Sequence, residues 1–109
     1  LVIDLRGNSG GLLSKSISIL DKLTERSVNL LNTKGRILKS NKEMNSRRAP
    51  MVPNEIPIAV LIDRSSASAS EIVSGVLQDL DRAVIIGQKS FGEHRQRPSV
   101  LQQKLPCRR

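Results

Sequence analysis

Residues 56–80 read IPIAVLIDRSSASASEIVSGVLQDL, and this stretch decides the fold because an apolar run passes directly into a helical pattern. Residues 56–63 are apolar and partly β-branched, which predicts a buried strand that tolerates Pro57 near its start. Over residues 70–80 the apolar side chains recur at helical spacing, with polar side chains between them, which predicts an amphipathic helix. The stretch therefore predicts a strand, a short turn and a helix.

The turn between this strand and this helix carries a cluster of hydroxyl side chains, at residues 65, 66, 68 and 70. Backbone N–H groups at the start of a helix lack intrahelical partners, which suits both helix capping and the stabilisation of an oxyanion. Alternating serine and alanine is equally typical of tight packing or of an N-cap. This turn taken alone leaves open whether one of its serines is a nucleophile or all of them are structural.

A second strand-to-helix turn lies at the start of the chain. Residues 1–5, LVIDL, predict another buried strand, the turn RGNSGG follows at residues 6–11, and residues 12–25 predict an amphipathic helix. In open α/β sheets, ligand sites form at the carboxyl ends of the strands, so the two turns are expected to meet. Gly10 and Gly11 allow backbone N–H groups to approach a substrate carbonyl closely, although they also simply make the turn.

The remaining segments complete an alternating α/β pattern. Residues 28–31 and 36–38 are expected to pair as a hairpin, residues 39–55 to form a loop, and residues 83–87, AVIIG, to form a last strand. The order strand, helix, hairpin, loop, strand, helix, strand predicts an α/β fold with helices packed on a mainly parallel sheet.

The composition restricts the chemistry open to this chain. A chain of 109 residues holds one modest core, and Phe91 is its single aromatic residue, so the core is expected to be aliphatic. The single Cys107 excludes an internal disulfide or a multi-cysteine metal site, and no metal or other cofactor is expected. His94 is the only histidine, so a Ser-His-Asp triad would have to use it. No apolar run is long enough to span a bilayer.

The net charge of +8 is concentrated at the end of the chain. Residues 94–109 contain no acid and five of the 18 bases, which leaves 13 bases against 10 acids in residues 1–93. The five bases of this basic tail are Arg95, Arg97, Lys104, Arg108 and Arg109. Because the tail has no interleaved aromatic residues and no zinc-finger spacing, specific nucleic-acid binding is not expected.

Two separated motifs in this chain resemble one known family, the carboxyl-terminal processing or tail-specific serine proteases. The matching segments are LVIDLRGNSGGLL at residues 1–13, the strand at 57–63, SSASASEIVSGVLQDLDRAVIIG at 65–87, and Ser-Phe-Gly at 90–92. The resemblance implies that the chain is a fragment of the α/β catalytic core of such a protease. It implies peptide hydrolysis near protein C-termini, and therefore a protein or peptide substrate, with no cofactor.

The resemblance also assigns site residues. It implies that Ser68 is the nucleophile and that N–H groups of the Gly10 and Gly11 turn and of Ala69 form the oxyanion hole. It implies that Asp79 supports the active site, although a solvated carboxylate late in the helix is the competing interpretation. The family uses a lysine as general base, which requires a neutral, desolvated amine near the serine.

The sequence departs from the family at the position of that lysine, where this chain has Glu93. A Ser/Lys mechanism is therefore incomplete, and the chain is expected to be inactive or poorly active; a non-catalytic peptide-binding remnant is the alternative. We expect residues 1–92 to be a partial catalytic core and residues 93–109 a divergent basic tail. The resemblance implies a location in the cell envelope or periplasm, with no signal in this chain to support it.

Overall fold

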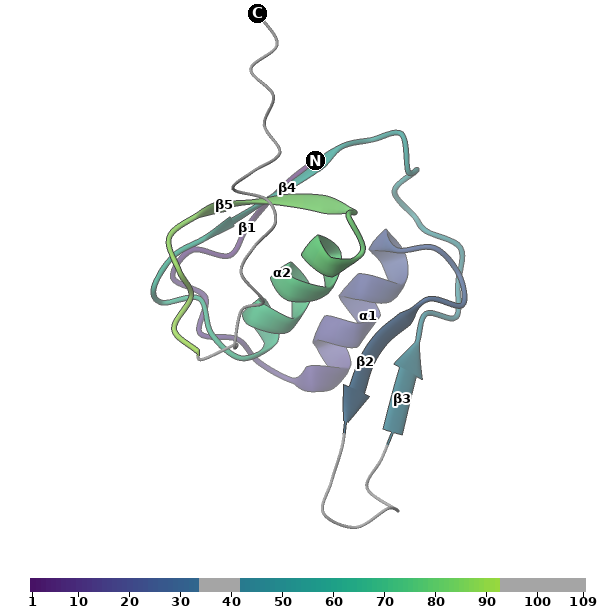
Figure 1. Cartoon of the computed structure of the whole chain (residues 1–109), viewed down its shortest axis with the longest axis horizontal. Coiled ribbons are helices and arrows are strands. Elements are labelled where there is room, and N and C mark those ends of the chain that lie inside the picture. Colours follow the sequence, from purple (N-terminus) through teal and green to yellow (C-terminus); the bar gives the residue numbers. More distant parts are fainter. Residues whose placement is uncertain (34–41, 93–109) are drawn as a thin grey trace, which may run out of the picture.

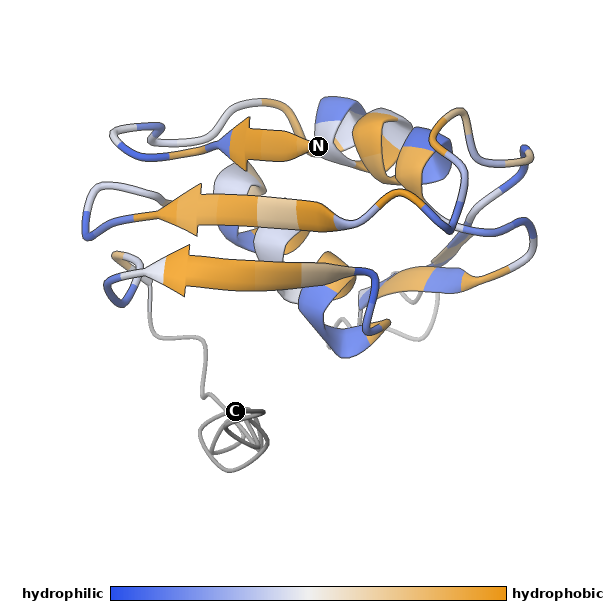
Figure 2. Cartoon of the chain, turned by 90° about the horizontal axis from the view of Figure 1, so that it is seen from above, coloured by the Kyte–Doolittle hydropathy of each residue, from blue (hydrophilic) through white to orange (hydrophobic). Residues whose placement is uncertain are grey.

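Three parallel strands form the main sheet of the computed structural model, which describes residues 1–33 and 42–92. The strands are β1 (Val2–Asp4), β4 (Ile58–Ile62) and β5 (Ala83–Gly87), in the order β1-β4-β5. Helices α1 (Leu13–Leu23) and α2 (Ala69–Asp79) connect them and lie on one face of the sheet (Figures 1 and 2). All three strands end at the same edge, because every pairing is parallel. The α/β fold with a parallel sheet, predicted from the sequence, is confirmed.

The core lies between this sheet and the two helices. Along β4 and β5 successive side chains alternate between the helix-covered face and the opposite one. Val60 is fully buried, whereas Val84 and Ile86 are exposed on the face away from the helices. The core consists only of aliphatic side chains: Leu20, Leu23, Leu30, Ile58, Val60, Val73 and Leu77.

An antiparallel hairpin of β2 (Asn29–Thr33) and β3 (Lys42–Asn45) forms a separate two-stranded sheet. The prediction of a loop over residues 39–55 was wrong for residues 42–45, because Lys, Glu and Asn have low strand propensity and gave no signal. The pairing with β2 holds these residues in a strand, aided by a 3.0 Å hydrogen bond from Asn29 Nδ2 to Asn45 Oδ1. The strand predicted at residues 36–38 lies outside the described residues.

The predicted helices and the last strand agree closely with the observed elements. Helix α2 was expected at residues 70–80 and begins one residue earlier, while β5 has the predicted bounds. Within the described residues, no helix is long and apolar enough to cross a membrane. The same residues contain no cluster of three His, Cys, Asp or Glu side chains that could hold a metal ion.

Candidate active site

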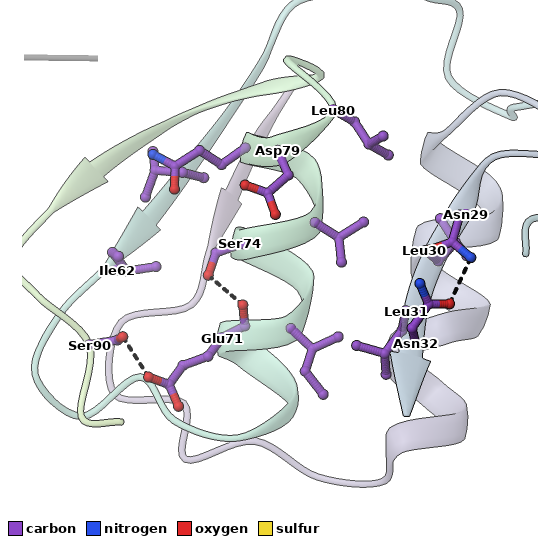
Figure 3. A pocket seen from close by; sticks show the side chains of 15 residues that line it. Asn29, Leu30, Leu31, Asn32, Ile62, Glu71, Ser74, Asp79, Leu80 and Ser90 are labelled. Atoms are coloured by element: carbon purple, nitrogen blue, oxygen red, sulfur yellow. Dashed lines mark hydrogen bonds between the residues drawn. The ribbon is translucent and has the colours of Figure 1, made fainter. Parts of the chain in front are cut away.

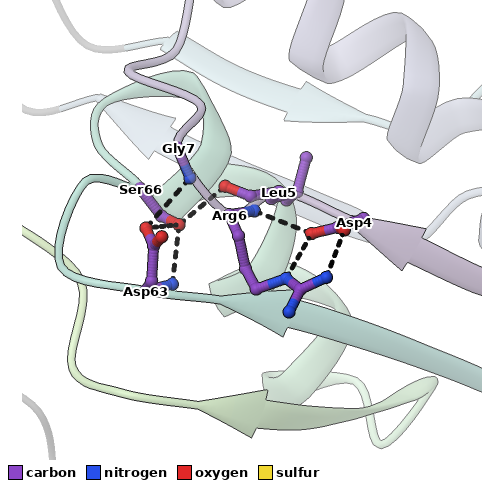
Figure 4. A network of polar contacts seen from close by, with 6 residues as sticks. All are labelled: Asp4, Leu5, Arg6, Gly7, Asp63 and Ser66. Atoms are coloured by element: carbon purple, nitrogen blue, oxygen red, sulfur yellow. Dashed lines mark hydrogen bonds and ion pairs between the residues drawn. The ribbon is translucent and has the colours of Figure 1, made fainter.

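Side-chain hydrogen bonds tie together the two strand-to-helix turns at the carboxyl edge of the sheet (Figure 4). Asp63, just after β4, accepts the Gly7 N–H at 3.0 Å and the Ser65 N–H at 2.9 Å through Oδ1. The Ser66 hydroxyl donates to the Leu5 carbonyl at 2.7 Å and accepts the Asp63 N–H at 3.0 Å. Because Ser66 is 0% exposed and bonded on both sides, it is a structural serine that joins the strand ends.

A second set of contacts brings the glycine-rich turn against the serine turn. The Asn8 carbonyl accepts the Ala67 N–H at 3.1 Å, and Asn8 Oδ1 accepts the Gly10 N–H at 2.9 Å. Gly10 has φ +99°, and a Cβ built on it would lie 2.6 Å from Ala67 O, 2.8 Å from Ala69 N and 2.9 Å from Ser68 Cβ. Only a residue without a side chain permits this approach. The structure thus places the two turns face to face.

Ser68 occupies the junction at which α2 begins. It has φ 53° and ψ −117°, a backbone conformation that non-glycine residues adopt rarely and at a cost of about 1–3 kcal/mol. Ser68 is exposed, whereas the neighbouring Ser66 and Ser70 are buried. A strained serine at a sharp strand-to-helix turn is the arrangement that displays the nucleophile in the α/β-hydrolase fold.

Two backbone N–H groups, one next to Ser68 and one in the glycine-rich turn, lack an acceptor within the described residues. Over residues 1–33 and 42–92, neither the Ala69 N–H nor the Gly11 N–H has a hydrogen-bond acceptor. The Gly10 N–H, by contrast, is already bonded to the Asn8 side chain. An exposed hydroxyl next to a free N–H donor, that of Ala69, suits attack on a carbonyl and stabilisation of the resulting oxyanion.

Glu71 connects Ser68 to the segment that follows β5. Its Oε2 accepts the Ser68 N–H at 2.9 Å, while Oε1 accepts the Ser90 hydroxyl at 2.6 Å and the Gly92 N–H at 2.8 Å. Figure 3 shows the Glu71 and Ser90 side chains pointing toward each other. The three-residue spacing from Ser68 to Glu71 is that of a capping box, a signal in the sequence that could have indicated the first contact and was not used. Nothing in the sequence predicted the contact with Ser90.

Asp79 is not brought to Ser68. It is the last residue of α2, roughly 16 Å along the helix axis from Ser68 at the usual rise per residue, and it is exposed. A cavity of about 480 Å³ runs beside α2 and is lined by Asp79, Glu71 and Ser90, but not by Ser68 (Figure 3). The role of Asp79 therefore stays a prediction, and Glu93 lies outside the described residues.

The carboxylates at the ends of β1 and β4 are both held in the charged form. The side-chain hydrogen bond from Arg6 lowers the pKa of Asp4 to about 2. The Gly7 N–H, and after it the Ser65 N–H, lower the pKa of Asp63 below its usual range. Both carboxylates are thus charged at neutral pH and accept hydrogen bonds from the turns that flank Ser68.

Comparisons with known proteins agree on one family. The family described as Peptidase family S41 matches residues 1–104. The chain is 47% identical over 93 residues to a carboxy-terminal-processing protease of Bartonella bacilliformis, covering 84% of this chain and 21% of the relative. It is 41% identical over 96 residues to a carboxyl-terminal-processing protease of Picosynechococcus, with the same coverage of 84% and 21%.

A solved structure shows the same likeness. The photosystem II D1 C-terminal processing protease superposes with a TM-score of 0.71 at 31% identity, covering 84% of this chain and 23% of that protein. The chain thus spans about a fifth of the length of the curated relatives it matches.

Proposed function

Because this chain belongs to peptidase family S41, we propose that it carries the nucleophile side of a serine peptidase site, with Ser68 as the nucleophile. The observation that carries this proposal is the backbone of Ser68, which is strained, exposed at the start of α2, and in contact with Gly10 of the other turn. Strain of this kind is retained where it serves a function and is over-determined by the surrounding contacts.

In the proposed reaction the Ser68 hydroxyl oxygen attacks the carbonyl carbon of a peptide bond, and its proton passes to a general base. The carbonyl oxygen becomes an oxyanion that accepts hydrogen bonds from the Ala69 N–H and the Gly11 N–H. Collapse of this intermediate expels the amine and leaves an acyl-enzyme, which water hydrolyses. Gly10 lets the glycine-rich turn lie close to Ser68 but is not proposed as a donor, because its N–H is bonded to Asn8.

The general base is the part of the mechanism that this sequence changes. The family resemblance places a lysine where this chain has Glu93. A glutamate with an ordinary pKa of about 4.3 is a weak base at neutral pH. We therefore propose a Ser/Lys site that lacks its lysine, so that this chain hydrolyses peptides poorly. The second candidate is a non-catalytic remnant that binds peptides, and Glu93 favours it as well. Asp79 would support such a site only through α2.

The relatives suggest the substrate class and the location. They are named carboxyl-terminal-processing proteases, so the proposed substrates are proteins and peptides cleaved near their C-termini. The proposed location is the cell envelope, the periplasm or an organelle lumen. Relatives from Tetradesmus obliquus and Arabidopsis thaliana are named chloroplastic.

The test compares cleavage of an unstructured protein by the parent chain, by Ser68→Ala, and by Glu93→Lys. In the Glu93→Lys chain, residues 94–109 are also replaced by a family-like continuation, that is, by the segment that follows the lysine in a relative. We expect the parent to match Ser68→Ala, and Glu93→Lys to raise the rate by roughly 10²-fold or more, the usual contribution of a general base. Adding Ser68→Ala to Glu93→Lys should abolish that gain. Peptide binding without turnover in every variant would identify the remnant, and parent cleavage that depends on Ser68 would contradict the loss of activity.

A further inference from the structure

The segment that follows β5 is attached to the site by hydrogen bonds rather than by apolar packing. The Gln88 N–H donates to the Ile62 carbonyl at 3.2 Å, and the Phe91 N–H donates to the Ser66 carbonyl at 3.0 Å. Phe91, whose ring would be the natural apolar anchor, is 79% exposed. The path of this segment past the start of α2 therefore depends on its polar contacts.

The shortest of these polar contacts joins Ser90 to Glu71, at 2.6 Å from hydroxyl to Oε1. A hydrogen bond to a charged carboxylate is shorter and stronger than one between neutral groups. The Gly92 N–H shares the same oxygen at 2.8 Å, whereas the Ser68 N–H is bound by the other oxygen at 2.9 Å. One carboxylate thus lies between the backbone of the nucleophile and the backbone that leads to residue 93.

Gly92 is in close contact with this carboxylate. A Cβ built on Gly92 would lie 2.6 Å from Glu71 Oε2 and 2.7 Å from Oε1, so a side chain there would displace the carboxylate. The terminal torsion of a glutamate is soft, and the carboxylate keeps one orientation only if its partners fix it. Ser90 is a side-chain partner of Oε1, whereas Gly92 and Ser68 bind the carboxylate through their backbone.

We propose that Ser90 is a positioning residue, whose hydroxyl orients the Glu71 carboxylate so that it binds the Ser68 N–H and the Gly92 N–H together. This fixes the chain next to position 93 relative to the nucleophile. The consequence for catalysis rests on the proposed function, because position 93 matters to the reaction only if Ser68 is the nucleophile. The contact itself does not rest on that function.

The first test measures the contact in the full 109-residue chain by amide hydrogen exchange and by the amide chemical shifts of Ser68 and Gly92. We expect Ser90→Ala to accelerate exchange at Gly92 roughly tenfold, on the scale of a lost hydrogen bond to a charged group. Ser90→Thr keeps the hydroxyl and should restore the parent exchange rate and shifts. Ser14→Ala, the same change at an exposed serine on α1, should leave both amides unchanged.

The second test adds Ser90→Ala to the Glu93→Lys chain with its family-like continuation. We expect kcat to fall about tenfold with KM unchanged, since misplacement of a base affects the chemical step, and Ser90→Thr should recover kcat. Unchanged exchange and shifts in Ser90→Ala would overturn the proposal whatever the activity. Faster exchange with unchanged kcat would overturn the positioning role. If Glu93→Lys shows no turnover, the proposed function fails, and the exchange data still decide the contact.

Discussion

Replacing Gly10 with alanine would push a methyl group into the contact between the two turns. The added Cβ would meet Ala67 O at 2.6 Å, Ala69 N at 2.8 Å and Ser68 Cβ at 2.9 Å. Two of these atoms belong to the backbone, so no side-chain rotation relieves the overlap. Gly11→Ala is the matched control, because a Cβ on Gly11 would meet nothing within 4 Å.

Two costs add for Gly10→Ala. A side chain at φ +99° is strained, and left-handed backbone costs an L-residue about 1–2 kcal/mol. Overpacking against a fixed neighbour costs about 1–3 kcal/mol more. The free energy of unfolding should therefore fall by about 2–5 kcal/mol, and each kcal/mol lowers the Tm of a small domain by about 4–8 °C. For Gly11→Ala, the change should stay within about 0.5 kcal/mol, as at ordinary surface positions.

Thermal unfolding followed by far-UV circular dichroism measures this difference, because the chain has no Trp or Tyr for fluorescence and its helices give a strong signal. We expect Gly10→Ala to unfold about 10 °C or more below the parent and Gly11→Ala to unfold with it. An equal Tm for the two alanine variants would refute the contact between the turns, and with it the face-to-face placement of Gly10 and Ser68.

Two further predictions concern the residues on either side of this contact. Ser68→Gly should be more stable than Ser68→Ala by about 1 kcal/mol, because glycine adopts φ 53° without strain; equal urea midpoints would show that the serine backbone is relaxed. Asp63→Asn should flatten the loss of stability in acid. The lowered pKa of Asp63 means that its contribution is fully present above the unfolded value of about 3.9 and is lost as the pH falls through the folded value. Urea midpoints measured from about pH 7 down to about pH 2 test this, and parallel curves for parent and variant would contradict it.

The sequence predicted the elements that have strong periodicity and missed those held by tertiary contacts. The strand at residues 83–87 and both helices are visible as apolar patterns, and the approach of the two turns follows from the rule that parallel strands end at one edge. The strand β3 was missed because Lys42–Asn45 has no strand propensity of its own. Pairing between segments distant in sequence overrides such local preferences.

In the site, too, tertiary contacts decide features of single side chains that the local sequence does not predict. Ser66 and Ser68 have nearly the same local sequence, and the chain alone cannot tell which is buried. Their difference arises from the Leu5 carbonyl, which accepts a hydrogen bond from Ser66 across 61 residues of sequence. The contact of Ser90 with Glu71 spans 19 residues and has no local signal at all. Motif similarity predicted a role for Ser68, and only the fold shows which contacts hold its backbone.

The contacts around Ser68 explain how a small domain maintains a strained serine. The strain costs about 1–3 kcal/mol, which is a large part of the 5–15 kcal/mol by which domains are usually stable. Each intramolecular hydrogen bond returns only about 1 kcal/mol, so no single contact balances that cost. The bonds from Ser66 to Leu5, from Gly7 to Asp63 and from the Ser68 N–H to Glu71 join the serine turn and its flanks to the end of β1, to the glycine-rich turn and to α2. Several contacts together, rather than any single one, therefore hold the turn in which Ser68 keeps its strained backbone.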